Sequence, residues 1–190
     1  PICMFAYGSK GLGVSASITS LIILCHFTLG VFLADRKFNL NVILKNPPFY
    51  AIIFSAIMLF YGIKMPVFVV NTTEWLMYVT IFLILMSLGI ALTRLKVFSL
   101  TNALISSFTR MIIGPAIGFF LIFIFNLKGF AAGVLLIQCS MPSAVLNYLV
   151  GSIYSPKKIV DSIASTIVVS TLISFVTIPI VVYIALRFFS

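Results

Sequence analysis

Acidic side chains are scarce in this chain. It has three Asp and Glu residues and one histidine among 190 residues, and none of the four is adjacent to another. Such a set cannot assemble a metal site or an acid–base pair within the chain. The sequence also has no strand followed by a glycine-rich phosphate loop. We therefore expect a protein that is not an enzyme and that needs no cofactor.

Cysteine is also rare, and its spacing is uninformative. The three cysteines, Cys3, Cys25 and Cys139, lie in apolar runs without metal-ligand spacing. This excludes a disulfide framework and a zinc site as explanations of the fold. An initiator Met and a signal peptide are missing too. Because the chain opens in mid-pattern at Pro1, we expect a C-terminal fragment that lacks an N-terminal part.

Apolar residues make up most of the chain. They account for 62% of it, charged residues for 8%, and the mean hydropathy is +1.27. A soluble domain of this length could not bury so much apolar surface, so the composition indicates an integral membrane protein. The net charge is +9. Its basic residues separate apolar runs, as they do in the loops of multi-pass proteins, and form no nucleic-acid patch.

The apolar runs predict an all-α polytopic membrane protein with five full transmembrane helices plus the end of a sixth. That end is residues 1–7, closed by Gly8. The run at 47–61 is marginal in length for a crossing. The predicted full spans are residues 11–33, 73–95, 106–127, 130–154 and 159–186.

Basic residues predict the orientation. One face carries eight of them and the other carries four, so the first face is expected to be cytoplasmic and the C-terminus to lie outside. The first set is Arg36, Lys37, Lys45, Arg94, Lys96, Arg110, Lys157 and Lys158, with Arg110 placed at the start of its span; the second is Lys10, Lys64, Lys128 and Arg187.

A proline lies at the centre of the 130–154 span. Pro142 has no N–H, so the Gln138 carbonyl is expected to lose its helical partner. Backbone irregularity at membrane depth is tolerated where it is buried in protein or lines a cavity, and broken helices often mark transporter binding sites. A half-helix starting at Pro142 would point free N–H groups at the membrane midplane, which favours an anion.

Small polar side chains surround this proline. Ser140 and Ser143 can add hydroxyl donors, and Asn147 adds an amide one turn further along. A carboxylate would suit such a site. The alternative is a packing kink without a ligand, in which these side chains form bonds between helices.

A weak internal symmetry accompanies the break. Pro1 precedes Tyr7 by six residues, and Pro142 precedes Tyr148 by six. Each short half-helix then leads into a span rich in Ser and Thr. The two units would cross the membrane in opposite directions, as an inverted repeat requires.

Met141-Pro142-Ser143-Ala144-Val145-Leu146-Asn147-Tyr148 resembles the signature of the auxin efflux carrier family, including its bacterial members. Three further segments resemble other helices of that family, and the resemblance covers almost all of the chain in order. These segments are Leu88-Gly89 with Arg94-Leu95, Gly114-Pro115, and residues 170–179. Phe82 departs from the pattern, because members often have a proline there, which leaves a kink at that point in doubt.

The resemblance implies ten helices in two inverted five-helix repeats, with crossing broken helices four and nine. Residues 1–33 would be the end of helix four and helix five, in the transport part, followed by a cytoplasmic linker at 34–46. Residues 47–95 would be helices six and seven, in the scaffold part. Residues 96–190 would be helices eight to ten, in the transport part, including broken helix nine.

The implied function is secondary transport of small organic anions such as carboxylates by alternating access. The expected binding residues are Ser140, Pro142, Ser143, Asn147, Tyr148 and Pro1. Coupling to H⁺ or Na⁺ and uniport remain open, and His26 is either a proton relay or a neutral packing residue. Other expected partners are membrane lipids and a second copy bound through the scaffold helices, but no nucleic acid. The expected location is the cytoplasmic membrane of a bacterium. The alternatives are an ion channel or pore-forming subunit, and a membrane assembly factor that does not transport.

Overall fold

A computed structural model describes residues 1–30, 47–63, 65–94, 97 and 99–189, and over these residues the protein is helical, without strands. The chain divides into two units. The first comprises Pro1–Thr19 and Leu95–Ser190, and the second comprises Ser20–Arg94. The predicted linker at 34–46 lies outside the described residues.

Four described helices are long and apolar enough to cross a membrane. They are Ile2–Gly30, Val67–Ser87, Leu100–Ile124 and Lys157–Phe188. This confirms the all-α, multi-pass class, while the total of five full spans and the inverted repeat stay predictions. Helix α4, Pro47–Phe60, has 14 residues. At about 1.5 Å per residue it is shorter than the roughly 30 Å hydrocarbon core, as its sequence indicated.

The first helix, α1 (Ile2–Cys25), is two helical pieces joined at Gly8. Gly8 has φ 66° and ψ −155°, a conformation that glycine adopts without steric cost. Gly11 then lies directly against the Cys3 carbonyl, where a side chain would not fit. The residues before Gly8 are therefore a separate helical piece, and their assignment as the end of a broken transmembrane helix stays a prediction. A π-helix, His26–Gly30, continues from the end of α1.

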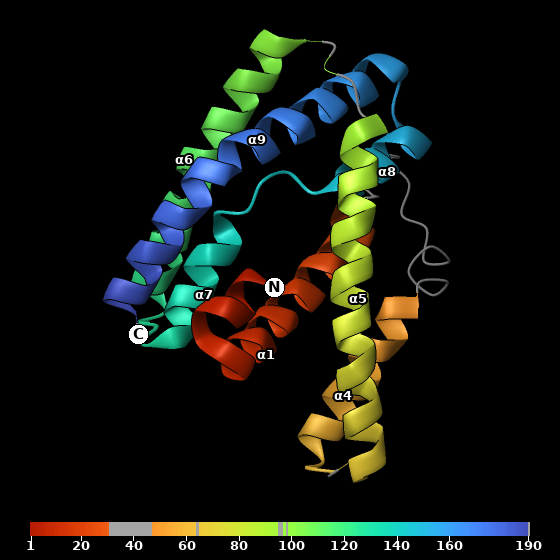
Figure 1. Ribbon diagram of the computed structural model, residues 1–190, viewed down its shortest axis with the longest axis vertical. Helices are drawn as coiled ribbons and strands as arrows, with labels where there is room; N and C mark the ends of the chain where they lie inside the picture. Colours follow the sequence, from red (N-terminus) through yellow and green to blue (C-terminus); the bar gives the residue numbers. More distant parts are fainter. Residues whose placement is uncertain (31–46, 64, 95–96, 98, 190) are drawn as a thin grey trace. The chain divides into compact units, whose positions relative to one another are not determined.

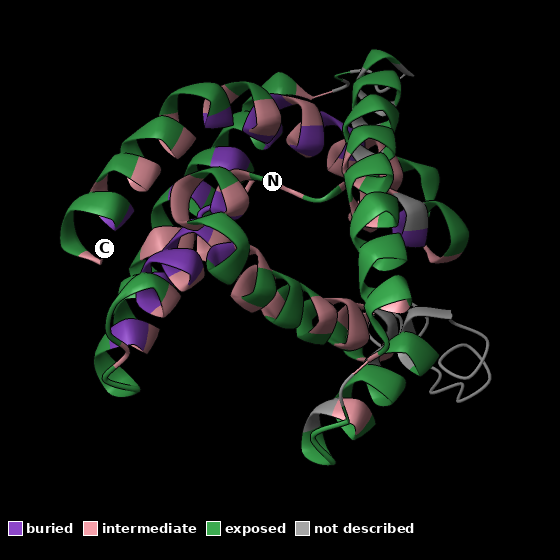
Figure 2. Ribbon diagram, turned by 60° about the horizontal axis from the view of Figure 1, so that its bottom comes forward, coloured by how far each residue is buried: buried purple, intermediate pink, exposed green. Residues whose placement is uncertain are grey.

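The first unit is built around α7, Phe130–Cys139. This helix packs against α6 (Leu100–Ile124) and α9 (Lys157–Phe188), and α8 (Val145–Tyr154) also packs against α9 (Figure 1). Four α7 side chains are at most 1% exposed. The residues drawn as buried in Figure 2 belong to this first unit. The core cluster comprises Cys3, Ile122, Ala132, Val134, Leu136, Ile137 and Ala185.

Small polar residues line the contact between α6 and α9. Ser107 is fully buried, and its hydroxyl donates to the Thr166 carbonyl at 3.4 Å. Thr177 Oγ1 lies 3.3 Å from the Met111 sulfur. Small and hydroxyl-bearing side chains allow membrane helices to approach closely and to bond with each other. This interface holds two long helices beside α7.

The second unit contains α4 and α5, Val67–Arg94. None of its described residues is buried, and its exposed apolar side chains include Trp75 at 75%. Helix α5 begins at Val67, six residues before the predicted 73, so Glu74 lies inside the helix.

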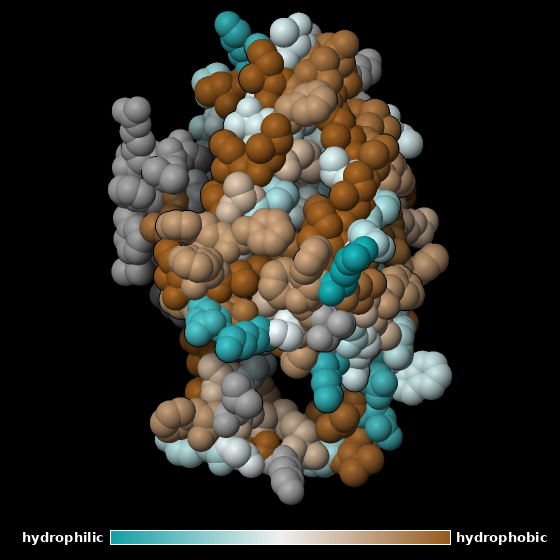
Figure 3. Space-filling model, turned by 90° about the vertical axis from the view of Figure 1, so that its left-hand side faces the viewer, coloured by the Kyte–Doolittle hydropathy of each residue, from teal (hydrophilic) through white to brown (hydrophobic). Residues whose placement is uncertain are grey.

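Exposed hydrophobic side chains also cover the first unit. Phe123 is 86% exposed and Phe175 is 74% exposed. Figure 3 shows one face of the molecule on which hydrophobic residues predominate and hydrophilic ones are few. Such surfaces are suited to lipid or to other transmembrane helices.

Candidate functional site

The predicted break in the 130–154 span is confirmed. Helix α7 ends at Cys139, α8 begins at Val145, and residues 140–144 between them are not helical. The Gln138 carbonyl has no i+4 partner, because Pro142 lacks an N–H, and it instead accepts a hydrogen bond from the Met141 N–H at 3.3 Å. A tight final turn thus satisfies the backbone at the end of α7.

The second half-helix starts later than predicted. Its first residue is Val145, three positions after Pro142, and its N-cap, Ala144, makes no side-chain capping bond. Asn147 therefore lies in the first turn of α8 and not one turn further along. By helix geometry the first N–H groups of α8 have no partner within the helix. The Asn147 N–H is an exception, since it bonds the Ala144 carbonyl at 3.1 Å.

Helix α9 holds the irregular segment in place. The Ser143 N–H donates to Ser170 Oγ at 3.2 Å, and Ser170 is fully buried. The Ser143 hydroxyl and the Asn147 side-chain amide form no hydrogen bond with the described residues, and both residues are half-buried. These two groups are therefore available to a ligand beside the start of α8.

The remaining predicted residues differ in what they can offer. Ser140 is buried, and its hydroxyl donates to the Leu136 carbonyl at 2.7 Å, so in this arrangement it can only accept. Tyr148 is half-buried on α8. Pro1 is exposed, and its carbonyl accepts a bond from the Phe5 N–H at 3.0 Å. Roles in ligand binding for these three residues stay predictions.

Helix α1 contacts α7 just before the break. The Gln138 side-chain amide donates to Ser15 Oγ at 2.6 Å and to Thr19 Oγ1 at 3.1 Å. Nearer the N-terminal ends of these two helices, the Tyr7 ring lies against Gly133, so a side chain at position 133 would collide with it. The Ser- and Thr-rich segment after Gly8 thus supplies the partners of an amide near the site.

Two glycines bring α6 onto the last turn of α7. A Cβ at Gly114 would collide with the Cys139 carbonyl. One at Gly118 would lie 3.1 Å from the Cys139 Cβ and 3.3 Å from Leu136 Cδ1. Glycines four residues apart allow two backbones to approach closely in a membrane. As a result, the side chains one turn before Gly114 reach the break.

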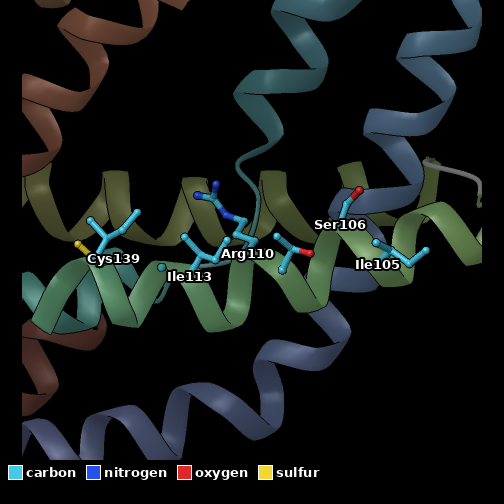
Figure 4. A pocket seen from close by; sticks show the side chains of 8 residues that line it. Ile105, Ser106, Arg110, Ile113 and Cys139 are labelled. Carbon is cyan, nitrogen blue, oxygen red and sulfur yellow. The ribbon is translucent and has the colours of Figure 1, made fainter. Parts of the chain in front are cut away.

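Arg110 is one of these side chains, and its predicted placement was wrong. Helix α6 begins at Leu100 and not at 106, so Arg110 lies inside the helix and not at its start. The Arg110 Nε donates to the Met141 carbonyl at 3.3 Å, which places the guanidinium beside the break (Figure 4). Without Arg110, the basic residues that set the orientation number seven against four.

An open groove of about 570 Å³ runs along this side of α6. Its walls include Ser106, Thr109 and Arg110 together with isoleucines, and Cys139 of α7 closes one end (Figure 4). The sequence did contain a signal for this site, because Arg110 is the only charged residue between Lys96 and Lys128. A helix start placed six residues too late concealed it.

The sequence profile of a family described as membrane transport protein matches residues 31–183. The chain belongs to this family, the auxin efflux carriers. It is also similar to an uncharacterized transporter of Methanocaldococcus jannaschii, with 31% identity over 188 residues, covering 94% of this chain and 60% of the relative. The chain thus spans about 60% of that relative's length. No solved structure matches. Family and helices together identify a multi-pass integral membrane protein of a transporter family.

Proposed function

We propose that the protein is a secondary transporter that moves small organic anions such as carboxylates by alternating access. One observation carries the proposal. The non-helical segment 140–144 is followed by the N-terminal end of α8, where the Asn147 amide and the Ser143 hydroxyl have no partner among the described residues. The start of a helix favours negative charge, and these side chains add neutral donors.

The hydrogen bonds around the break support a unit that moves as one body. Ser170 of α9 holds Ser143, and Ser15 of α1 holds Gln138. In inverted-repeat transporters, one part that carries the broken helices rocks against another around a fixed site. In our proposal residues 1–33 and 96–190 form the transport part, and residues 47–95 form the scaffold that also joins two copies. The exposed apolar side chains of α5 are consistent with such a lipid- or protein-facing scaffold.

The proposed orientation places Lys157 and Lys158 in the cytoplasm and Lys128 outside. The protein would then lie in the cytoplasmic membrane of a bacterium. The driving force is either an H⁺ or Na⁺ gradient or the membrane potential alone. For export of an anion from a negative interior, the potential contributes about 2.3 kcal/mol per charge per 100 mV.

Flux measurements test this function. The protein at its natural length is reconstituted in vesicles, and uptake of labelled malate and indole-3-acetate is followed with pH and sodium gradients imposed separately. We expect flux that saturates with concentration and is inhibited by unlabelled carboxylate. Flux that stays linear with concentration, accompanied by chloride conductance, would contradict the proposal and favour a channel.

A further inference from the structure

Arg110 carries a positive charge inside α6, a helix that is long and apolar enough to cross a bilayer. It follows the first residue of the helix, Leu100, by ten positions, which is about 15 Å along the helix axis. A charge within the hydrocarbon region of a membrane is costly and is found where a cavity, water or an opposite charge compensates it. In a membrane, Arg110 therefore requires a compensating group.

The protein supplies no carboxylate for this purpose in the first unit. Its single acidic residue is Asp161. Asp161 lines another cavity, together with Lys157 and Lys158. Among the described residues, Arg110 bonds only the Met141 carbonyl, through Nε. Since arginine has five N–H donors, both terminal NH₂ groups remain for a ligand.

The surroundings of Arg110 favour an anion with a carboxylate. The bond to Met141 fixes the guanidinium next to Pro142. Isoleucines such as Ile113 line the groove and lower the effective dielectric constant, which strengthens a charge pair. The planar guanidinium matches the two oxygens of a carboxylate, so one ligand group can satisfy both NH₂ groups.

We propose that Arg110 is a substrate-binding residue that pairs with the carboxylate of the transported anion beside the break. This inference rests on the proposed function and adds a fixed positive charge to the neutral donors Ser143 and Asn147. The groove along α6 receives the rest of the molecule. A site of this kind discriminates an anion from its neutral analogue by charge.

Two substitutions of Arg110 test this discrimination in reconstituted natural-length protein. Arg110→Gln removes the charge but keeps an N–H donor, and Arg110→Lys keeps the charge. The readouts are the KM for labelled indole-3-acetate and malate and the inhibition constants of their neutral amides. For Arg110→Gln we expect the KM for the acids to rise about tenfold to a hundredfold while the amides are unaffected. For Arg110→Lys we expect a smaller rise.

A second pair of variants leaves Arg110 in place. Ile113→Glu puts a carboxylate on the groove wall about one turn from Arg110, where it competes with the substrate, and Ile113→Gln is the matched uncharged control. We expect the KM for the acids to be higher in Ile113→Glu than in Ile113→Gln, while the inhibition constants of the neutral amides stay equal in the two variants. This pair decides the question if Arg110→Gln does not fold.

The outcomes separate three explanations. Equal losses for acid and amide in Arg110→Gln would mean that Arg110 only braces Met141, and would overturn the inference. Equal KM values for the two Ile113 variants would overturn it as well. If the unsubstituted protein shows no saturable flux of either acid, the proposed function itself fails, and the pairing fails with it.

Discussion

Replacing Gly114 by alanine probes the contact that brings α6 onto the break. The added methyl group would collide with the Cys139 carbonyl, a backbone atom that cannot rotate away. Overpacking of this kind costs about 1–3 kcal/mol. The better helix propensity of alanine offsets about 0.5–1 kcal/mol of that cost. Because the collision is with a backbone atom, the cost lies in the upper part of this range, about 2–3 kcal/mol, and we expect a net loss of about 1–2.5 kcal/mol in stability.

Thermal melting of the natural-length protein in detergent measures this loss. At about 2–4 °C per kcal/mol, the Tm of Gly114→Ala should fall by about 2–10 °C. Gly13→Ala is the matched control, because Gly13 is also helical and in the first unit but has no atom within 4 Å of an added Cβ. Its Tm should be unchanged or slightly higher. A Gly114→Ala protein that melts at or above the unsubstituted Tm would refute the close contact.

Three further predictions concern the site and the orientation. Asn147→Ala should weaken carboxylate binding about ten- to a hundredfold without lowering the Tm, since one hydrogen bond to a charged group is worth about 1.5–3 kcal/mol; unchanged binding would remove Asn147 from the site. Pro142→Ala restores a backbone N–H, so transport should fall while the Tm stays equal or rises, and normal transport would indicate a mere packing kink. In a cysteine-free background, an impermeant thiol reagent applied to intact cells should label a cysteine at Lys128 but not one at Ser155, and the opposite pattern would reverse the topology.

The sequence predicted those features that depend on local composition. Apolar runs separated by basic residues predicted the helices α6 and α9, and Pro142 predicted the break. The start of α8 was missed because it depends on a distant residue. Ser170, 27 residues further along the chain, accepts the Ser143 N–H and thereby holds this part of the chain outside the helix. No local pattern around Pro142 contains that information.

Arg110 was misplaced for a different reason. Residues 100–105 are a mixture of polar and apolar side chains that a hydropathy criterion places outside the span, yet they form the first turns of α6. The sequence-based prediction therefore placed Arg110 near the end of a helix, whereas in the structure it lies near the middle of α6. Its contact with Met141 also requires the close approach at Gly114, which is a property of packing and not of either segment alone.

At the break, backbone groups maintain the shape of the chain, and two polar side chains take no part in this. The shape of the segment is maintained through backbone groups: the Gln138 and Met141 carbonyls accept hydrogen bonds, and the Ser143 N–H donates one. The Ser143 hydroxyl and the Asn147 amide take no part in maintaining it. In the proposed site, substitutions at these two side chains would therefore change which anion is recognised without changing the architecture, so that specificity could diverge through single mutations.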